Sequence, residues 1–445
     1  MLRSPKRKPQ NSMSSSAELN RPAADETEPL LNPSNTTRNY TSGDGGMSPG
    51  PGPDQDWSRQ SLALRIYHAI LRLNNINVLL AFLPLGILSG LLGWNSILTA
   101  VFNFLAIISL SALVSYSSDE LSHYLGELSG ALINATFGNA VELISGIVAL
   151  SRGEIHFAQS VMIGSILSDI LLVLGGCLIS AAYRKHVLKF KMAEADALSS
   201  LMIITAVALI LPTVLYSAFG SSNSSSDIDD KIVSFSHGTA LVLFILYAGY
   251  LYFHLGTHSH LFVEDQGDAL SVTSDDDATD NNNNNPARQE ESPSLSLSTA
   301  TVLLLAATAG IMGCTHFLLK NVDQTAHITS MSKTFIAAIL IPIASNSPEG
   351  AAVVAASRDG DVNFAIGVIV SSILQIALFV VPFLVMLGWV IQQPMTLNFE
   401  NFQTIILFFA VLVVNHLLQA GKYTYIHGVM LVALYAAIAT ALYTR

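Results

Sequence analysis

Long apolar runs alternate with short polar segments from about residue 76 to the end of the chain. A helix needs about 20 mostly apolar residues to cross the hydrocarbon core of a bilayer. The pattern therefore predicts an all-α integral membrane protein with eleven transmembrane helices. The predicted spans are 76–93, 96–117, 128–150, 158–181, 196–216, 233–255, 297–317, 333–356, 362–388, 402–419 and 425–443.

Two longer polar segments divide this pattern. Residues 1–60 are rich in Ser, Pro, Gly and Asn without an apolar core, which predicts a disordered cytosolic tail and no cleavable signal peptide. Residues 263–296 carry several aspartates and a run of asparagines, and they separate a first half, 61–262, from a second half, 297–445. Such a segment cannot form a packed core. It is interpreted as a cytosolic tether, and the alternative is a calcium-sensing or gating element.

The composition fits this class. Of the 445 residues, 51% are hydrophobic and only 12% are charged, which argues against a soluble enzyme and gives no sign of a nucleic-acid partner. Cytoplasmic loops retain Lys and Arg. Most of the 21 basic residues, including those in the short loop 182–195, fall on one side if the N-terminus is cytosolic. Eleven spans then place the C-terminus in a lumen or outside the cell.

Two short polar motifs, Gly138–Glu142 (Gly-Asn-Ala-Val-Glu) and Ser345–Glu349 (Ser-Asn-Ser-Pro-Glu), interrupt apolar spans. An ionisable residue at this depth costs about 2.5–3.5 kcal/mol on insertion scales, so two matching ones indicate a functional site. Gly138 marks a predicted helix break in the first motif. Pro348 removes a backbone donor, which predicts a second break at Ser345 and the residues that follow it.

The two motifs belong to an internal repeat. Aligning Asn139 with Asn346 also aligns Glu142 with Glu349, and a one-residue gap then brings the segment 164–169 onto 370–375. If the repeat units are helices two to six and seven to eleven, each unit has an odd number of spans, so the copies lie inverted. The prediction is an N-terminal helix followed by two inverted five-helix repeats. Secondary transporters of this design bind their substrate near the bilayer midplane, between the repeats.

The conserved chemistry of the two copies is a set of oxygen ligands without thiolates. Its predicted members are Glu142, Glu349, Asn139, Asn346, Gln375, Ser165 and Ser371. Such a set suits Ca²⁺, with Mn²⁺ as a second candidate. Burial favours a protonated carboxyl group and a bound dication favours the carboxylate, so cation and protons compete for Glu142 and Glu349. This competition predicts coupled exchange by a transporter, without a cofactor and without enzymatic chemistry.

Three polar residues near this set have less defined roles. Asp169 aligns with Gln375, and it is interpreted either as a third carboxylate of the site or as a neutral helix-contact residue. Ser168 and Ser372 are interpreted as small residues that permit close helix packing.

These motifs resemble those of the vacuolar cation/proton exchangers of fungi and plants, within the calcium/cation antiporter superfamily. The resemblance runs from about Asn77 to the C-terminus. It rests on the segments 134–143, 164–168, 171–175, 250–253 with 257–258, and 371–372 with 375–376. It implies an eleven-helix exchanger that loads Ca²⁺ into an acidic vacuole in return for H⁺, with Glu142 and Glu349 as the shared ion-binding groups.

Three positions depart from the family pattern, one of them His237, where a basic residue is common in the family. The histidine that usually follows the second motif glutamate is replaced by Gly350, and the family usually has Asn at the position of Asp169. A Na⁺-coupled or monovalent cation exchanger of the same superfamily is therefore the alternative. A passive channel is less compatible with opposed carboxylate motifs, and no nucleophile, aspartyl dyad or His-Glu-x-x-His motif supports an intramembrane hydrolase.

The predicted location is the membrane of a vacuole, which the chain crosses several times. Membrane lipid is therefore one expected partner. In the tail, Glu26 followed by Leu30 and Leu31 resembles an acidic dileucine signal, which predicts a cytosolic sorting adaptor.

Overall fold

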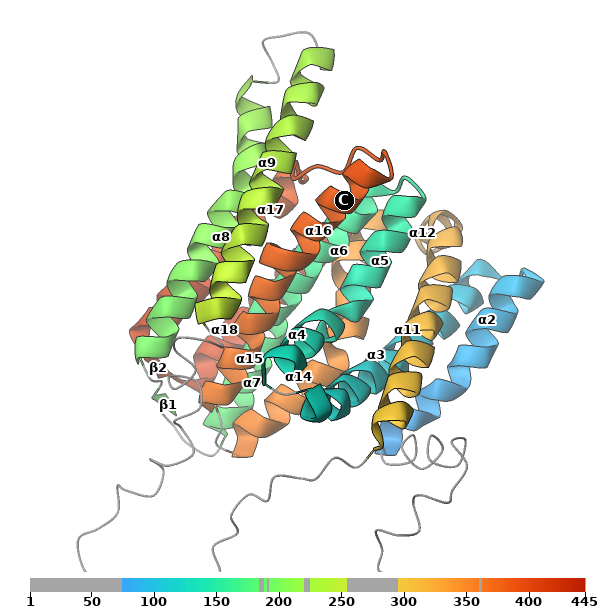
Figure 1. The fold of residues 1–445 in the computed structure, drawn as a ribbon, viewed down its shortest axis with the longest axis horizontal. Helices are drawn as coiled ribbons and strands as arrows, with labels where there is room; N and C mark the ends of the chain where they lie inside the picture. The colour runs from blue at the N-terminus through green and yellow to red at the C-terminus, as the bar shows by residue number, and fades with distance from the viewer. Residues whose placement is uncertain are drawn as a thin grey trace, which may run out of the picture. The chain divides into compact units, whose positions relative to one another are not determined.

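The computed structural model consists almost entirely of helices (Figure 1). It describes residues 74–125, 127–183, 188–189, 192–219, 225–253, 295–359 and 362–444. All of them belong to one compact unit, Trp57–Arg445. The tail 1–60, the sorting motif at Glu26, Leu30 and Leu31, and nearly all of the segment 263–296 lie outside the described residues.

The helices of the first half are η2 (Asn74–Ala81), α2 (Phe82–Leu92), α3 (Ser96–Leu125), α4 (Glu127–Gly138), α5 (Ala140–Ser151), α6 (Ile155–Leu167), η3 (Ser168–Val173), α7 (Leu174–Ala182), α8 (Met192–Phe219) and α9 (Ser225–Leu251). Those of the second half are α11 (Leu297–Lys320), α12 (Val322–Thr329), α13 (Lys333–Phe335), η7 (Ile336–Leu340), α14 (Ile341–Asp359), α15 (Val362–Gln375), η8 (Ile376–Val380), α16 (Val381–Val390), α17 (Asn401–Ala420) and α18 (Tyr425–Thr444).

The described residues contain 9 helices that are long and apolar enough to cross a membrane, or up to 10 if a bent pair counts as one span. The bent pair is Leu132–Gly138 with Ala140–Ser151. The first predicted span, 76–93, is represented by the shorter apolar helix Val78–Leu92. The prediction of a polytopic helical membrane protein is therefore confirmed, whereas the count of eleven is not.

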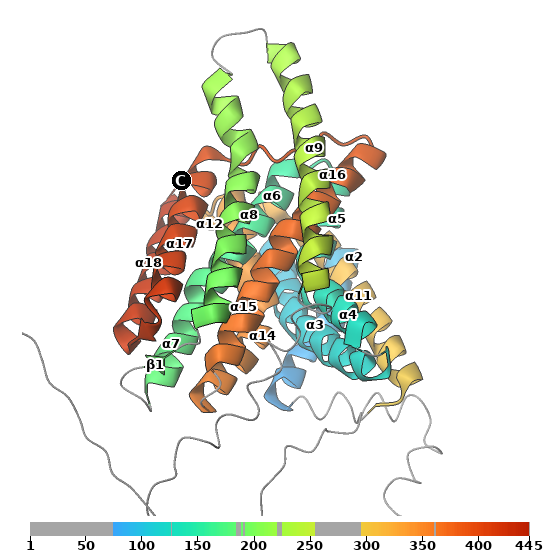
Figure 2. The ribbon, with the colours of Figure 1, turned by 60° about the vertical axis from the view of Figure 1, so that its left-hand side comes forward.

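Two long helical spans form the centre of the bundle. In Ile155–Ala182, which comprises α6, η3 and α7, 78% of the most apolar window is buried, and in Val362–Val390, which comprises α15, η8 and α16, the share is 72%. The corresponding share for α18 is 28%. Helices α8 and α9 pack beside each other and against α17 and α16, respectively (Figure 2). The two central spans therefore face protein on most sides, while α18 offers most of its apolar surface to lipid.

Three π-helical segments, η3, η7 and η8, each lie inside a longer helical span, and two of them occupy matching positions in the repeat. The segment η3 contains Asp169, and η8 begins directly after Gln375, the residue that aligns with Asp169. The third, η7, precedes Pro342 in the second motif helix. Wide turns of this kind are rare and occur frequently at functional sites. Here they interrupt three of the four spans that carry the candidate polar residues, the exception being the bent pair α4 and α5.

A glycine permits a close backbone contact between the two halves. Gly164 in α6 packs so tightly against Ala338 in η7 that an added Cβ would overlap the backbone oxygen and Cα of Ala338. Small residues permit such contacts between membrane helices, where dispersion forces take the place of the hydrophobic effect. Gly164 thereby places its neighbour Ser165 directly beside the second motif helix.

The only strands among the described residues are β1 (Leu188–Lys189) and β2 (Lys422–Tyr423), which pair antiparallel with Lys189 opposite Lys422. They lie in the connections between α7 and α8 and between α17 and α18. Both connections therefore lie on one side of the bundle, as the charge pattern predicts. That this side is cytosolic stays a prediction.

Candidate cation-binding site

The first motif forms a helix break. Helix α4 ends at Gly138, α5 begins at Ala140, and the two helices are bent by 57°. Asn139 lies between them with φ −103° and ψ 28°, outside the helical conformation, and is only 3% exposed. Glu142 lies in the first turn of α5 and is 2% exposed. The amide groups of this first turn point toward the break and favour a negative charge there. The interruption therefore positions an amide and a carboxyl group in the protein interior.

The second motif does not break its helix, so this prediction, made for Ser345 and Pro348, is wrong. Helix α14 runs through Pro348 without interruption. Hydroxyl groups bond to the backbone oxygens of the preceding turn. Ser345 Oγ donates to the Pro342 oxygen at 3.2 Å, Ser347 Oγ donates to the oxygen of Ile343, and Ser111 Oγ of α3 donates to the Ser345 oxygen at 2.8 Å. Hydroxyl donors and local π turns are the usual means by which membrane helices tolerate proline.

The two motif asparagines are held by a crossed pair of contacts. Asn139 Nδ2 donates to Gln375 Oε1 at 2.8 Å, and Asn346 Nδ2 donates to Asp169 Oδ1 at 2.7 Å. Because Asn139 aligns with Asn346 and Asp169 with Gln375, each asparagine binds the partner position of the other repeat. This exchange joins the two halves of the chain at one point.

Ser372 connects the two crossed contacts. Its Oγ lies 3.0 Å from Asp169 Oδ2 and 3.2 Å from Asn139 Oδ1. Its interpretation as a packing residue is therefore incomplete, since the hydroxyl group binds two polar groups of the site. Among the described residues, Ser168 is in contrast buried and makes no hydrogen bond to another candidate residue of the site, which agrees with its interpretation as a packing residue.

The two glutamates have different surroundings. Glu142 Oε1 accepts a hydrogen bond from Ser165 Oγ at 2.9 Å, and Ser165 also contacts Asn346 Oδ1 at 3.2 Å. Glu349 is only half-buried and, within the described part of the chain, makes no hydrogen bond to a protein group. It interacts electrostatically with Glu142 and with Asp119, an exposed residue near the end of α3. Asp119 could not be identified from the sequence, because it lies in no repeat motif.

Gln375 and Ser371 extend the network away from the glutamates. Gln375 Nε2 donates to Ser371 Oγ at 3.2 Å, and Ser371 Oγ lies 3.1 Å from the hydroxyl group of Tyr250 in α9. Tyr250 was not among the candidate site residues, although it belongs to one of the motifs on which the family resemblance rests.

The carboxyl groups cannot hold a metal ion alone. Asp169 interacts electrostatically with both Glu349 and Glu142, but no group of three or more His, Cys, Asp or Glu residues in the described ranges is arranged to bind a metal. A hard cation at the glutamates would therefore need the neighbouring amide and hydroxyl oxygens as further ligands. The structure brings these groups together from α5, α6, η3, α14 and α15.

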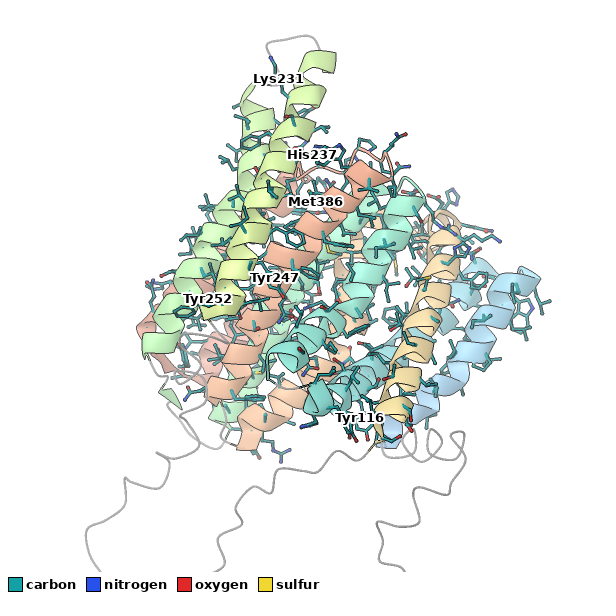
Figure 3. All side chains as sticks on the ribbon, viewed as in Figure 1. Tyr116, Lys231, His237, Tyr247, Tyr252 and Met386 are labelled. Atoms are coloured by element: carbon teal, nitrogen blue, oxygen red, sulfur yellow. The ribbon has the colours of Figure 1, made fainter. Side chains whose placement is uncertain are left out.

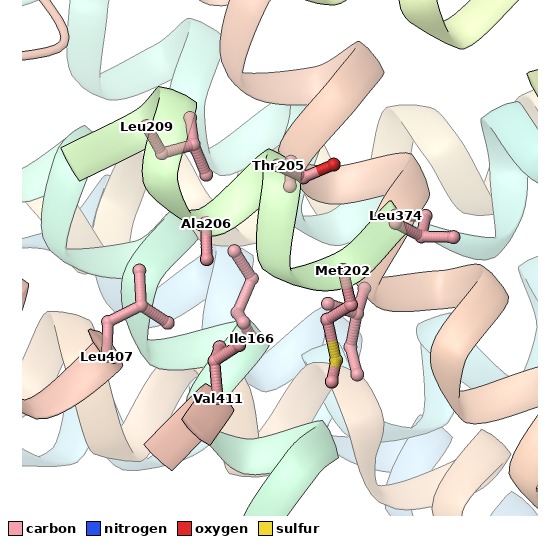
Figure 4. A pocket seen from close by; sticks show the side chains of 10 residues that line it. Ile166, Met202, Thr205, Ala206, Leu209, Leu374, Leu407 and Val411 are labelled. Atoms are coloured by element: carbon pink, nitrogen blue, oxygen red, sulfur yellow. The ribbon is translucent and has the colours of Figure 1, made fainter. Parts of the chain in front are cut away.

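A small pocket near Ser165 has different chemistry. It lies between α6, α8, α15 and α17, and its lining is apolar except for Thr205 (Figure 4). Hydrocarbon walls give a dication no ligands, so this pocket is not a second ion site.

Comparison with known proteins assigns the family. The model of the sodium/calcium exchanger protein family matches residues 95–256 and 299–444. The chain belongs to this family. It is 34% identical to a vacuolar calcium ion transporter of Schizosaccharomyces pombe, over 88% of this chain and 90% of the relative.

Two further similarities agree with the resemblance stated from the motifs. The chain is 31% identical to vacuolar cation/proton exchanger 2 of Oryza sativa subsp. japonica, over 87% of this chain and 85% of the relative. The solved structure of native YfkE superposes with a TM-score of 0.68 at 25% identity, covering 83% of this chain and 99% of that chain. The predicted membership among vacuolar exchangers is therefore confirmed. The matches place the crossed contacts of Asn139 and Asn346 inside the exchanger fold.

Proposed function

We propose that the chain is a secondary antiporter that exchanges Ca²⁺ for H⁺ by alternating access. The observation that carries the proposal is the crossed contact between the repeats, Asn139 with Gln375 and Asn346 with Asp169, beside Glu142 and Glu349. The names of the relatives, a vacuolar calcium ion transporter and a vacuolar cation/proton exchanger, support the same substrates. The proposed arrangement is one N-terminal helix and two inverted five-helix repeats.

In this mechanism Glu142 and Glu349 bind either one Ca²⁺ or two protons. Both loaded forms of the glutamate pair are neutral, so either can be exposed to the opposite side at low electrostatic cost. The empty pair carries two charges, and its passage through a low-dielectric interior is disfavoured. A gradient of about two pH units acting on two protons supplies about 5.5 kcal/mol, which supports about a 10⁴-fold cation gradient.

The amide and hydroxyl groups complete the proposed ligand set. Asn139, Asn346, Gln375, Ser165 and Ser371 offer neutral oxygens that adjust the coordination without changing the charge. Ser165 donates to Glu142, which gives a buried carboxyl group a hydrogen-bond partner. Glu349 is the more exposed of the two glutamates, and the exposed Asp119 interacts with it electrostatically.

The proposed location is the membrane of a vacuole or another acidic organelle, with a cytosolic N-terminus and a luminal C-terminus. Its partners there are membrane lipid and, at Glu26, Leu30 and Leu31, a sorting adaptor. Mn²⁺ is proposed as a second substrate because the ligand set consists of oxygen atoms.

Transport by purified protein in sealed liposomes tests the proposal. With an acid-inside pH gradient we expect Ca²⁺ uptake that stops when a protonophore, K⁺ and valinomycin collapse the gradient. Uptake that requires a Na⁺ gradient and ignores the pH gradient would instead establish the Na⁺-coupled alternative.

The presence of Asp169 in the site favours the Na⁺-coupled alternative. A third carboxyl group adds a negative charge that can balance an additional monovalent cation. We expect Asp169→Asn to fold, since an amide can still accept from Asn346 and donate to Ser372. Removal of the charge should change the ratio of Ca²⁺ to Mn²⁺ or Na⁺ transport, or its pH dependence, by about threefold or more. Competition uptake assays measure this ratio.

Asp323→Asn is the matched control, because Asp323 is paired with Lys333 outside the site. Unchanged selectivity and pH dependence in Asp169→Asn would reduce Asp169 to a packing residue.

A further inference from the structure

A chain of hydrogen bonds connects the first motif to a helix that carries none of the candidate ligands. It runs from Asn139 to Gln375, from Gln375 to Ser371 and from Ser371 to Tyr250, with distances of 2.8, 3.2 and 3.1 Å. Tyr250 lies near the C-terminal end of α9 and is 5% exposed. Its hydroxyl group thus lies in the protein interior and links α9 to Ser371 of α15.

The two contacts of the crossed pair differ in the group that accepts the hydrogen bond from asparagine. Asp169 offers Asn346 a carboxylate, whose two oxygens both accept hydrogen bonds. Gln375 offers Asn139 an amide, whose oxygen accepts and whose nitrogen only donates. The Asn139 contact therefore exists only when Gln375 points its oxygen toward Asn139, while the Asn346 contact does not depend on such a choice.

Ser371 and Tyr250 determine the orientation of the Gln375 amide. When Ser371 directs its proton to the Tyr250 oxygen, its own oxygen can only accept. Gln375 must then turn Nε2 toward Ser371 and Oε1 toward Asn139, which is the arrangement observed. Because Asn139 Nδ2 can only donate, it needs Gln375 Oε1 as its acceptor, so the opposite orientation of the Gln375 amide would satisfy neither neighbour.

We infer that Tyr250 is a positioning residue of the cation site, which acts through Ser371 and Gln375 to orient the side chain of Asn139. The orientation matters because Gln375 binds Asn139 Nδ2. Asn139 Oδ1 then points toward Ser372 in the protein interior. A site with this amide oxygen in place binds Ca²⁺ more tightly than one in which it is free to turn. This inference rests on the proposed function.

Tyr247 provides a matched control one turn away. It lies on the same helix and is 4% exposed, and its ring stacks on Phe379 of η8 with centroids 5.2 Å apart. Within the described residues its hydroxyl group makes no hydrogen bond. Tyr247 lies in the half of α9 distant from Lys231 (Figure 3). Tyr250→Phe and Tyr247→Phe thus remove the same atom, one inside the chain of bonds and one outside it.

The experiment measures Ca²⁺ binding to the purified full chain by calorimetry and the KM and Vmax of uptake in liposomes. For Tyr250→Phe we expect the Kd and KM for Ca²⁺ to rise about three- to tenfold with Vmax within about twofold, the size of one lost hydrogen bond. Tyr247→Phe should match the wild type. Equal effects of the two variants would indicate general packing and overturn the inference.

A second variant, Gln375→Glu, distinguishes a positioning role of Tyr250 from a packing role. Gln375→Glu replaces the amide by a carboxylate, which has no orientation to choose. In this background Tyr250→Phe should change the Kd by less than about twofold, because the partner is no longer oriented by Ser371. The same fold-change in both backgrounds would overturn the inference.

The two proposals fail differently. A wild-type protein that binds and exchanges Ca²⁺ while Tyr250→Phe behaves identically would refute the role of Tyr250 and leave the proposed function intact. A wild-type protein that neither binds nor exchanges Ca²⁺ would refute the proposed function and the role of Tyr250 with it.

Discussion

Replacement of Glu142 or Glu349 by glutamine should lower Ca²⁺/H⁺ exchange by about 100-fold or more while the protein remains folded. Each substitution keeps the side-chain volume and removes one negative charge. Two unit charges 4 Å apart at an effective dielectric constant of about 20 interact by about 4 kcal/mol, which corresponds to roughly a thousandfold in affinity. An amide also cannot take up and release the exchanged proton. Ca²⁺ transport and H⁺ transport should therefore be lost together.

Uptake in liposomes measures the loss, and gel filtration with a thermal unfolding scan measures folding. Glu154→Gln is the control, because Glu154 lies at the start of α6 and faces Lys333 at 3.8 Å outside the site. It should transport like the wild type. Transport at the wild-type rate by Glu142→Gln or Glu349→Gln would refute the assigned site.

Gly164→Ala should impair both stability and transport. The added methyl group would overlap the backbone of Ala338, which cannot rotate away as a side chain could. Overpacking of this kind costs about 1–3 kcal/mol. The strain should also move Ser165 away from Glu142 and Asn346. We expect a lower unfolding temperature and about a tenfold or greater loss of Ca²⁺ uptake, since tenfold corresponds to about 1.4 kcal/mol.

Gly367→Ala is the matched control. Gly367 lies in α15, and nothing stands within 4 Å of the position that its Cβ would take. It should unfold at the wild-type temperature and transport at the wild-type rate. If Gly164→Ala behaves like Gly367→Ala, the contact between α6 and η7 does not position the site.

The sequence was sufficient for the fold class and for the neighbourhood of the site. Apolar runs long enough to span a bilayer leave only helices as an option, because every backbone group must be satisfied internally. The alignment of Asn139 with Asn346 placed both motifs in one site, and Asp169 and Gln375 do lie beside them. These inferences depend on the length of the apolar runs and on the internal repeat, both of which can be seen in the sequence itself.

The state of the second motif helix could not be predicted in the same way. Pro348 cannot donate to the Ala344 oxygen, but whether the helix breaks also depends on how the neighbouring residues are held. Ser111, which lies more than two hundred positions earlier, donates to the adjacent Ser345 oxygen. The π turn of η7 adjusts the backbone before Pro342. The contact of Ser111 is a tertiary effect that a local proline rule does not include, so that rule gave the wrong result.

The roles of Ser372 and Tyr250 were missed for a related reason. A serine in a membrane helix is compatible with packing and with hydrogen bonding, and only the position of Asp169 beside it decides between them. Tyr250 contacts Ser371 across 121 positions of the chain. Neither contact has a spacing that one helix could reveal.

The central claim is that Ca²⁺ and protons compete for Glu142 and Glu349. Proton release on Ca²⁺ binding tests it most directly, measured with a pH indicator in a weakly buffered solution of the purified protein. The account predicts that the wild type releases protons as Ca²⁺ binds and that the double variant E142Q/E349Q neither binds Ca²⁺ nor releases protons. Saturable Ca²⁺ binding by the wild type without proton release would contradict the claim.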